Sequence, residues 1–401
     1  MSKKNRKWLV FTIMCLAYMP GSYAQYQLSV FAPELIQSFG LTTSQFSSLF
    51  TAPMIVAIFL SFVGGMISDK VGSKKVINIS FVIAGIGMIG RVFANSYMPF
   101  FLCMALTGFS NMFVNINASK ITASWFEQEK LGILMGIFAF CGQLPGAFAT
   151  ATTAVLFDSR TSAFIVSAIF CISVFVLWLL FVKDRPEDTM EEREKIDQEN
   201  QPSIGDSLKV VLSNKGIWLV SICIMMALGS MVTLSTFMPV ALQTMYGIDL
   251  KVCGTIASML TLGNCIGSIT GPIVFSKIKN VKVFVSGAAV LSFAGIIMCW
   301  RFPSIFVLHI LVLYTGIMLG ASMPIFLSAP VLLEGLGTKY AGSAAGVIST
   351  LQLLGAVLIP TYILTPIAGD NYSLLFMLAS ICMVIMFLCG LLLPQFGNNQ
   401  K

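Results

Sequence analysis

Amide and phenol side chains interrupt the long apolar runs of this sequence at widely spaced positions. Gln143 and Gln352 each stand a few residues after a Gly-x-x-x-Gly segment, and each is followed by leucine. The other members of this set are Gln25, Tyr26, Asn111, Asn115 and Tyr314. Such groups can hydrogen-bond a small solute, but they provide neither an activated nucleophile nor a metal site. The sequence therefore predicts a binding function, with no enzymatic activity, no cofactor and no bound metal.

A second set of residues forms a charged, glycine-rich turn between two apolar runs. It comprises Gly65, Asp69, Lys70, Gly72 and Lys74. The flanking runs, 44–67 and 76–94, are long enough to cross a hydrocarbon layer about 30 Å thick as helices. Gly72 is predicted to adopt a backbone conformation that a Cβ would strain, and the lysines are predicted to hold the turn at the cytoplasmic surface. We expect Asp69 to bind the positive N-terminal end of a neighbouring helix.

Composition indicates the class of protein. Hydrophobic residues make up 57% of the 401 residues and charged residues only 10%, where a soluble protein carries roughly a quarter. The chain is therefore predicted to lie in the lipid bilayer of the cytoplasmic (inner) membrane as a multi-pass protein. The net charge of +7 comes from bases in short connections between apolar runs, so it does not indicate nucleic-acid binding. The ten cysteines are scattered through apolar runs without a Cys-x-x-Cys pair, which is typical of buried thiols rather than disulfides.

The apolar runs predict an all-α membrane protein with twelve transmembrane helices. Their expected bounds are 8–36, 44–67, 76–94, 97–121, 130–157, 161–182, 216–244, 252–276, 281–301, 303–328, 340–368 and 371–393. The first is predicted to be an uncleaved helix that bends near Pro20 and Gly21. With these bounds, all but four of the 24 Lys and Arg residues fall on one side, so both termini are expected in the cytoplasm.

A polar segment divides the spans six and six. We predict an N-terminal six-helix bundle over 1–182, a cytoplasmic linker over 183–215 and a C-terminal six-helix bundle over 216–401. The segment around Gln143 recurs around Gln352 at an offset of about 210 residues. Since an even number of spans separates the copies, they share one orientation, which predicts two pseudo-symmetric bundles with a cavity at mid-membrane.

The turn from Gly65 to Lys74 resembles the signature between the second and third helices of the major facilitator superfamily, G-x-x-x-D-[RK]-x-G-[RK]-[RK]. Ser73 replaces the first basic residue after the second glycine. The resemblance implies a transporter that works by alternating access, expected to be a monomer. The residues it places at the cytoplasmic gate are Gly65, Asp69, Lys70, Gly72 and Lys74. Those it places in the cavity as substrate-binding residues are Gln143, Gln352, Tyr26, Gln25, Asn111, Asn115 and Tyr314.

Several short segments are similar to the FLVCR branch of this superfamily, whose members are transporters of choline and ethanolamine, linked also to heme. They are Arg6-Lys7-Trp8, Gln27-Leu28-Ser29, Trp125-Phe126, Gln143-Leu144 and Gln352-Leu353. This second resemblance implies that Gln143 and Gln352 bind the substrate, with Tyr26 as a further contact.

Four ionisable residues near the membrane surface are candidates for other roles. Arg91 and Arg301 end the third and ninth spans, where we expect anchors at the outer interface, with contact to an anion as the alternative. Glu34, the only acid of the first span, is expected to pair with Arg91 rather than to carry a coupling proton. His309, the only histidine, is expected to be a packing residue, with proton sensing as the alternative.

The lack of charged residues in the middle of every span favours a neutral, zwitterionic or quaternary-ammonium metabolite as the solute. A small carboxylate that binds Arg91 or Arg301 is the alternative. A membrane-embedded enzyme or receptor is a second alternative, from a different class. The coupling ion, a proton or sodium, and the direction of transport stay open at this level.

Overall fold

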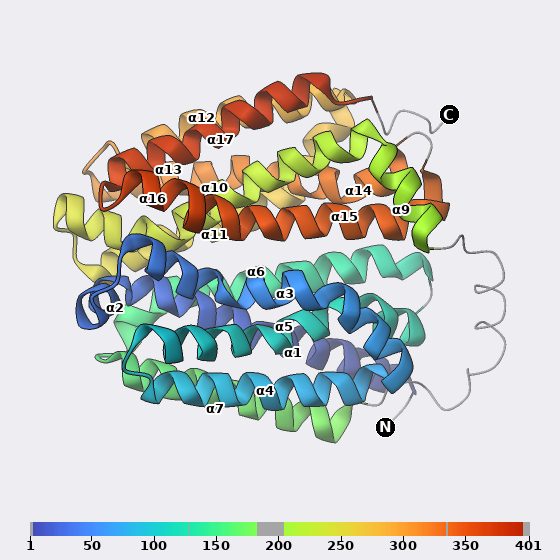
Figure 1. Ribbon diagram of the computed structural model, residues 1–401, viewed down its shortest axis with the longest axis horizontal. Coiled ribbons are helices and arrows are strands. Elements are labelled where there is room, and N and C mark those ends of the chain that lie inside the picture. The colour runs from blue at the N-terminus through green and yellow to red at the C-terminus, as the bar shows by residue number, and fades with distance from the viewer. Residues whose placement is uncertain (1–2, 127, 183–203, 334–335, 396–401) are drawn as a thin grey trace. The chain divides into compact units, whose positions relative to one another are not determined.

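The computed structural model describes residues 3–126, 128–182, 204–333 and 336–395. All regular secondary structure in these ranges is helical (Figure 1). The chain divides into two compact units, Met1–Glu192 and Arg193–Lys401. The point of division lies within the predicted polar linker, and the domain bounds 1–182, 183–215 and 216–401 stay a prediction.

The first unit follows the predicted spans closely. Its helices are α1 (Lys3–Val30), α2 (Ala32–Phe39), α3 (Thr43–Val71), α4 (Ser73–Phe93), α5 (Tyr97–Trp125), α6 (Gln128–Leu156) and α7 (Arg160–Phe181). A capping box begins α3, in which the Thr42 side chain accepts from the Gln45 backbone N–H and the Gln45 side chain accepts from the Thr42 N–H.

The predicted first helix is two helices, and their boundary differs from the expected one. α1 runs unbroken through Pro20, and the interruption comes at Phe31, whose φ of −88° and ψ of 12° are not helical. Pro33 lies in the first turn of α2, where backbone N–H groups have no partner within the helix. The N–H that proline lacks is therefore not needed there.

The second unit contains several interrupted helices. Its elements are α9 (Ile204–Ser213), α10 (Lys215–Tyr246), α11 (Leu250–Ile278), α12 (Val281–Met298), α13 (Ile305–Ala321), α14 (Met323–Leu332), α15 (Gly337–Leu358), the π-helix η1 (Ile359–Leu364), α16 (Thr365–Ala368) and α17 (Tyr372–Leu392). α9 lies within the predicted linker 183–215, whose residues 183–203 lie outside the described part. Prolines explain two interruptions, since Pro324 begins α14 and Pro360 begins the π-helix.

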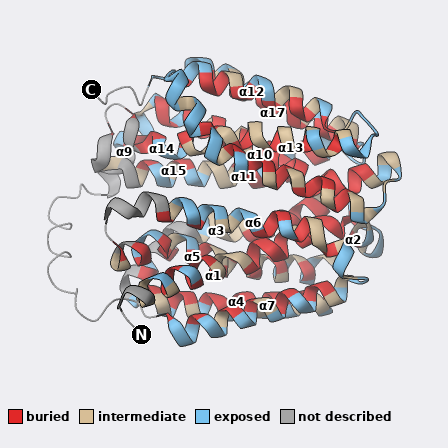
Figure 2. Cartoon of the chain, turned by 180° about the vertical axis from the view of Figure 1, so that it is seen from behind, coloured by how far each residue is buried: buried red, intermediate tan, exposed pale blue. Residues whose placement is uncertain are grey.

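Eleven helices of the described chain are long and apolar enough to cross a membrane. α1 is the twelfth span, and it is more polar because it lies inside its unit. The polar residues of its C-terminal half, Ser22, Gln25, Gln27 and Ser29, are all buried. Figure 2 shows buried residues along the helices of each unit. By contrast, α7 exposes an apolar stripe that suits contact with lipid, comprising Ile165, Ile169, Ile172 and Val176. The protein is thus an all-α membrane protein with twelve transmembrane helices.

Candidate functional site

Polar side chains are exposed on the membrane-spanning helices α5 and α6 of the first unit. Asn115, Ser119 and Lys120 are exposed on α5, and Gln143 is exposed in the middle of α6. Polar groups within a span face the interior of a protein or a water-filled pathway, because contact with lipid tails is costly. We call these four residues the polar surface of α5 and α6, and it is the candidate solute-facing surface of this unit.

Two tyrosine rings from α1 pack on the turn of α6 that carries Gln143. A Cβ on Gly142 would lie 2.0 Å from Cε1 of Tyr18, and a Cβ on Gly146 would lie 2.9 Å from Cδ2 of Tyr26. The absence of side chains at these two positions is therefore what admits both rings to α6. The structure thus places the predicted ligand Tyr26, and also Tyr18, against the turn of α6 in which Gln143 lies.

Asn111 lies against the part of α1 that contains Pro20. With its amide oriented to satisfy both ends, it donates to the carbonyl oxygen of Tyr18 (3.1 Å) and accepts from the backbone N–H of Ser22 (3.1 Å). A Cβ on Gly21 would lie 2.4 Å from the side-chain amide of Asn111, so glycine is needed there. Asn111 thus bridges the backbone groups of one turn of α1, which is a role in helix packing.

Two other predicted binding residues hold neighbouring helices together. Gln25 is 7% exposed, and its side chain donates to the carbonyl oxygen of Phe50 on α3 at 2.8 Å. Tyr314 on α13 donates its hydroxyl to the carbonyl oxygen of Leu291 on α12 at 3.4 Å. Their part in substrate binding stays a prediction.

In the second unit, polar groups gather on one stretch of α15. Gln352 is half-buried, and Ser349, three residues earlier on the same face of the helix, is exposed. The hydroxyl of Thr350 is already bonded to the carbonyl oxygen of Gly346 at 2.9 Å. Gln352 and Ser349 are therefore the candidate solute-facing groups of α15.

The predicted gate is described only in part. Gly72 joins α3 to α4 with φ at 93°, which confirms the expectation of a conformation that a Cβ would strain. Its N–H donates to the carbonyl oxygen of Ser68 at 3.1 Å, and Lys74 is half-buried. The side chains of the remaining gate residues, Gly65, Asp69 and Lys70, lie outside the described part, and their role stays a prediction.

The family model of the Major Facilitator Superfamily matches residues 10–360 of the chain. The chain belongs to the major facilitator superfamily. Its expected resemblance to that family, drawn from the Gly65–Lys74 turn, is confirmed.

Relatives of this facilitator are named as transporters, and a solved structure shares its fold. The probable sulfoacetate transporter SauU of Cupriavidus necator is 24% identical over 364 residues, 85% of this chain and 83% of the relative. The galacturonate transporter of Dickeya chrysanthemi is 22% identical over 309 residues, 74% of this chain and 90% of the relative. An inward-facing, unoccupied bacterial homolog of the human lysosomal transporter Spinster has the same fold, with a TM-score of 0.76 at 13% identity over 98% of this chain and 95% of that one. None of these three supports the FLVCR branch.

Arg91 of this facilitator is not the interfacial anchor that its place at the end of α4 predicts. Its side chain is 1% exposed and lies inside the first unit. The guanidinium donates to the carbonyl oxygen of Ala24 (2.9 Å), to Oε1 of Gln27 (3.1 Å) and to the hydroxyl of Ser167. The expectation is wrong because the side chain extends from α4 into the unit, where its partners Ala24 and Gln27 on α1 and Ser167 on α7 lie.

The expected pairing of Glu34 with Arg91 is also wrong. Glu34 lies on α2, and its carboxylate is 3.3 Å from Nε of Arg160 at the start of α7. The same arginine donates to Ser38 at 3.1 Å. Because Arg91 is turned into the unit, Arg160 is the cation within reach of Glu34.

Glu34→Gln is expected to change the initial uptake rate by less than about twofold, because the carboxylate is used in a partly exposed ion pair. The measurement is uptake into proteoliposomes across a range of pH values, with Arg160→Gln as the partner variant. Loss of a pH dependence seen in the wild type would instead assign the coupling proton to Glu34.

His309 and Arg301 lie in the second unit, and neither contacts the Gln352 segment in any recorded interaction. Nδ1 of His309 is 2.8 Å from the carbonyl oxygen of Ile305 in its own helix, and Nε2 is 3.2 Å from Oγ1 of Thr255 on α11. Both ring nitrogens thus have partners, as expected for a packing histidine. Arg301 is exposed and lies over the ring of Trp300 at 5.4 Å.

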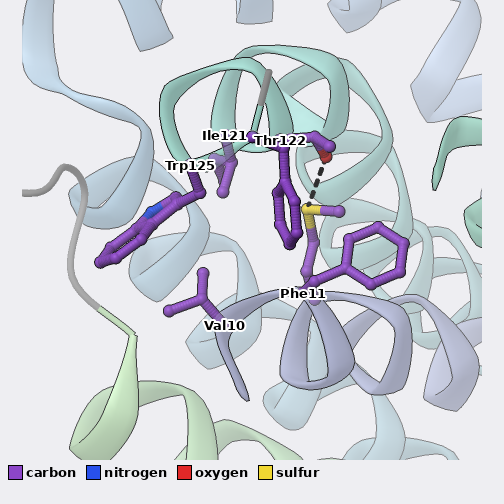
Figure 3. A pocket seen from close by; sticks show the side chains of 7 residues that line it. Val10, Phe11, Ile121, Thr122 and Trp125 are labelled. Carbon is purple, nitrogen blue, oxygen red and sulfur yellow. Dashed lines mark hydrogen bonds between the residues drawn. The ribbon is translucent and has the colours of Figure 1, made fainter. Parts of the chain in front are cut away.

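A small crevice lies between α1 and α5, and two of its lining residues, Trp125 and Phe126, belong to the segments that resemble the FLVCR branch (Figure 3). Its lining residues are Val10, Phe11, Met14, Ile121, Thr122, Trp125 and Phe126. Rings of Trp8 and Phe126 meet edge-on with centroids 5.1 Å apart, so the Trp125-Phe126 segment closes the end of α5 on α1. These aromatic residues are packing groups, and the crevice has no room for a solute.

Proposed function

We propose that this facilitator transports a small organic anion, a carboxylate or a sulfonate. The observation that carries the proposal is the pair of relatives named for sulfoacetate and galacturonate, which align with 85% and 74% of the chain. Both named solutes carry an acidic group that is ionised at neutral pH. The favoured expectation from the sequence, a neutral or quaternary-ammonium solute, has no such support.

The chemistry of the polar surface of α5 and α6 supports an anion. Asn115 and Gln143 offer amide N–H donors, and Lys120 offers a cation, whereas the set contains no carboxylate. Hydrogen bonds from such donors to an ionised acceptor are stronger than those to a neutral one. An anion therefore finds complementary groups here, whereas a quaternary ammonium ion would lack a counter-charge.

Lys120 is a charged residue that the expectation of an uncharged solute did not take into account. It lies near the end of α5, where a base is expected as a topological anchor on the cytoplasmic side. The exposed position on the same helix as Asn115 suggests a second role, which is to raise the local concentration of anions at the inner end of the pathway.

The mode of transport that we propose is alternating access by the two units, with the termini and the Gly65–Lys74 turn on the cytoplasmic side of the inner membrane. The internal repeat and the family support this mode, and Asp69 is the proposed stabiliser of cytoplasmic closure. Coupling to a proton or to sodium is compatible with it.

Counterflow in proteoliposomes tests the proposal. Vesicles with purified protein are loaded with unlabelled galacturonate, sulfoacetate or choline, and uptake of the matching labelled solute is followed. We expect saturable exchange of at least one of the two anions, at a rate at least about tenfold above that of choline. Exchange of choline without exchange of either anion would refute the anion assignment, and empty vesicles provide the background rate.

A further inference from the structure

One turn of α1, Ala24–Gln27, is attached to four other helices of the first unit. The carbonyl oxygen of Ala24 accepts from Arg91 on α4 (2.9 Å), and Gln25 donates to the carbonyl oxygen of Phe50 on α3 (2.8 Å). Because successive helical residues point in directions about 100° apart, bonds at neighbouring positions fix the rotation of this turn.

The other two residues of the turn contact the two remaining helices. Gln27 donates from Nε2 to the carbonyl oxygen of Ala163 on α7 at 3.2 Å. Tyr26 packs on Gly146 of α6, where an added Cβ would lie 2.9 Å from the ring. Tyr26, which contacts α6, therefore lies in the sequence between Gln25 and Gln27, whose side chains are bonded to α3 and α7.

Arg91 has the largest number of bonds in this arrangement. It donates to Ala24, to Oε1 of Gln27 and to Ser167, and its guanidinium carbon lies 4.4 Å from the ring centroid of Phe164. All of these partners are neutral, although the side chain is fully buried. A buried cation is costly unless several well-placed hydrogen bonds offset its desolvation, so this arginine indicates a geometric role.

We propose that Arg91 is a positioning residue that sets the rotation of the Ala24–Gln27 turn and thereby presents Tyr26 to the transported solute. It reaches two positions of the turn at once, with separate nitrogens of one planar group. A lysine at this position carries the same charge but has a single nitrogen. The inference rests on the proposed binding role of Tyr26 beside Gln143.

A double-mutant cycle on Arg91→Lys and Tyr26→Ala tests the inference. Uptake rates are expressed per folded transporter. Arg91→Lys is expected to raise the KM for uptake about tenfold when Tyr26 is present. In the Tyr26→Ala background the same change is expected to alter KM by less than about twofold, because the group that it positions is gone. Arg160→Lys, at the exposed ion pair with Glu34, is the matched control and should leave KM unchanged.

Two results of the cycle would overturn the inference. Arg91→Lys could lower the thermal midpoint while KM stays at the wild-type value, which is the signature of a purely structural arginine. Alternatively, the fold-change in KM of the double variant could equal the product of the fold-changes of the two single variants. That result would show that Arg91 does not act through Tyr26.

A second measurement needs no substrate and so separates this inference from the proposed function. The thiol in Tyr26→Cys is alkylated with a maleimide, in protein whose half-buried cysteines Cys103, Cys141 and Cys389 are alanine. Arg91→Lys is expected to change the rate of alkylation at position 26 by more than about threefold, and to leave the rate in Asn115→Cys on α5 unchanged. Equal rates at position 26 with Arg91 and with Lys would overturn the positioning role, even if no anion were transported.

Discussion

Replacing both Gln143 and Gln352 with alanine is expected to abolish uptake while the protein stays folded. Each amide is exposed or half-buried within a membrane span, and neither has a recorded hydrogen-bond partner in the described structure. A hydrogen bond to an ionised group contributes about 1.5–3 kcal/mol, so each single substitution should lower uptake by about 10- to 150-fold. The measurement is the initial rate of uptake per folded transporter in proteoliposomes.

The matched control for this pair is Gln37→Ala. Gln37 is an exposed glutamine on α2, outside the candidate surface, so its loss should leave uptake unchanged. The thermal midpoint of the double variant should stay near that of the wild type, because truncation of exposed side chains usually alters stability by less than about 0.5 kcal/mol. Uptake at the wild-type rate in the double variant would remove both glutamines from the binding site.

Gly142→Ala is expected to lower uptake about tenfold or more through Tyr18. The new methyl group would lie 2.0 Å from Cε1 of the ring, which is stacked on Phe138 with centroids 4.8 Å apart. Since Phe138 backs the ring, either the ring or α6 must move, at a cost of about 1–3 kcal/mol. Movement of α6 displaces Gln143, the next residue in the chain. Uptake kinetics and the thermal midpoint are both measured.

Gly136→Ala provides the control in the same helix. An added Cβ there meets no atom within 4 Å, so stability and uptake should stay close to the wild-type values. The double variant Gly142→Ala with Tyr18→Ala should recover thermal stability, because the clash is removed. Recovery of full uptake as well would show that the Tyr18 ring takes no part in binding.

The membrane spans could be predicted because hydropathy is a property of each segment by itself. Expected and observed bounds agree within a few residues from α3 to α7, since charged or glycine-containing turns end these apolar runs. Interruptions within runs were harder to predict. Pro20 lies inside an unbroken helix, where Asn111 bridges Tyr18 and Ser22, whereas Pro33 begins a new helix.

The candidate site could be predicted only in part. Residue type and position predict Gln143 and Tyr26 as candidates, and the spacing of Gly142 and Gly146 is the available signal for Tyr18. A pair of glycines does not, however, specify which ring packs against it. Lys120 was missed because a base near the end of a span has the same sequence signature whether or not it faces a solute pathway.

The sequence by itself determined that this protein is a twelve-helix major facilitator, because length, apolarity and the Gly65–Lys74 turn are local properties of the chain. Only the tertiary structure decided the partners of the charged residues near the ends of the spans. Arg91 is turned into the first unit, and Glu34 pairs with Arg160 across 126 positions of sequence (160 − 34). Those partners depend on which helices are neighbours and on which face each helix turns toward its neighbour. Side-chain packing over the whole unit determines both.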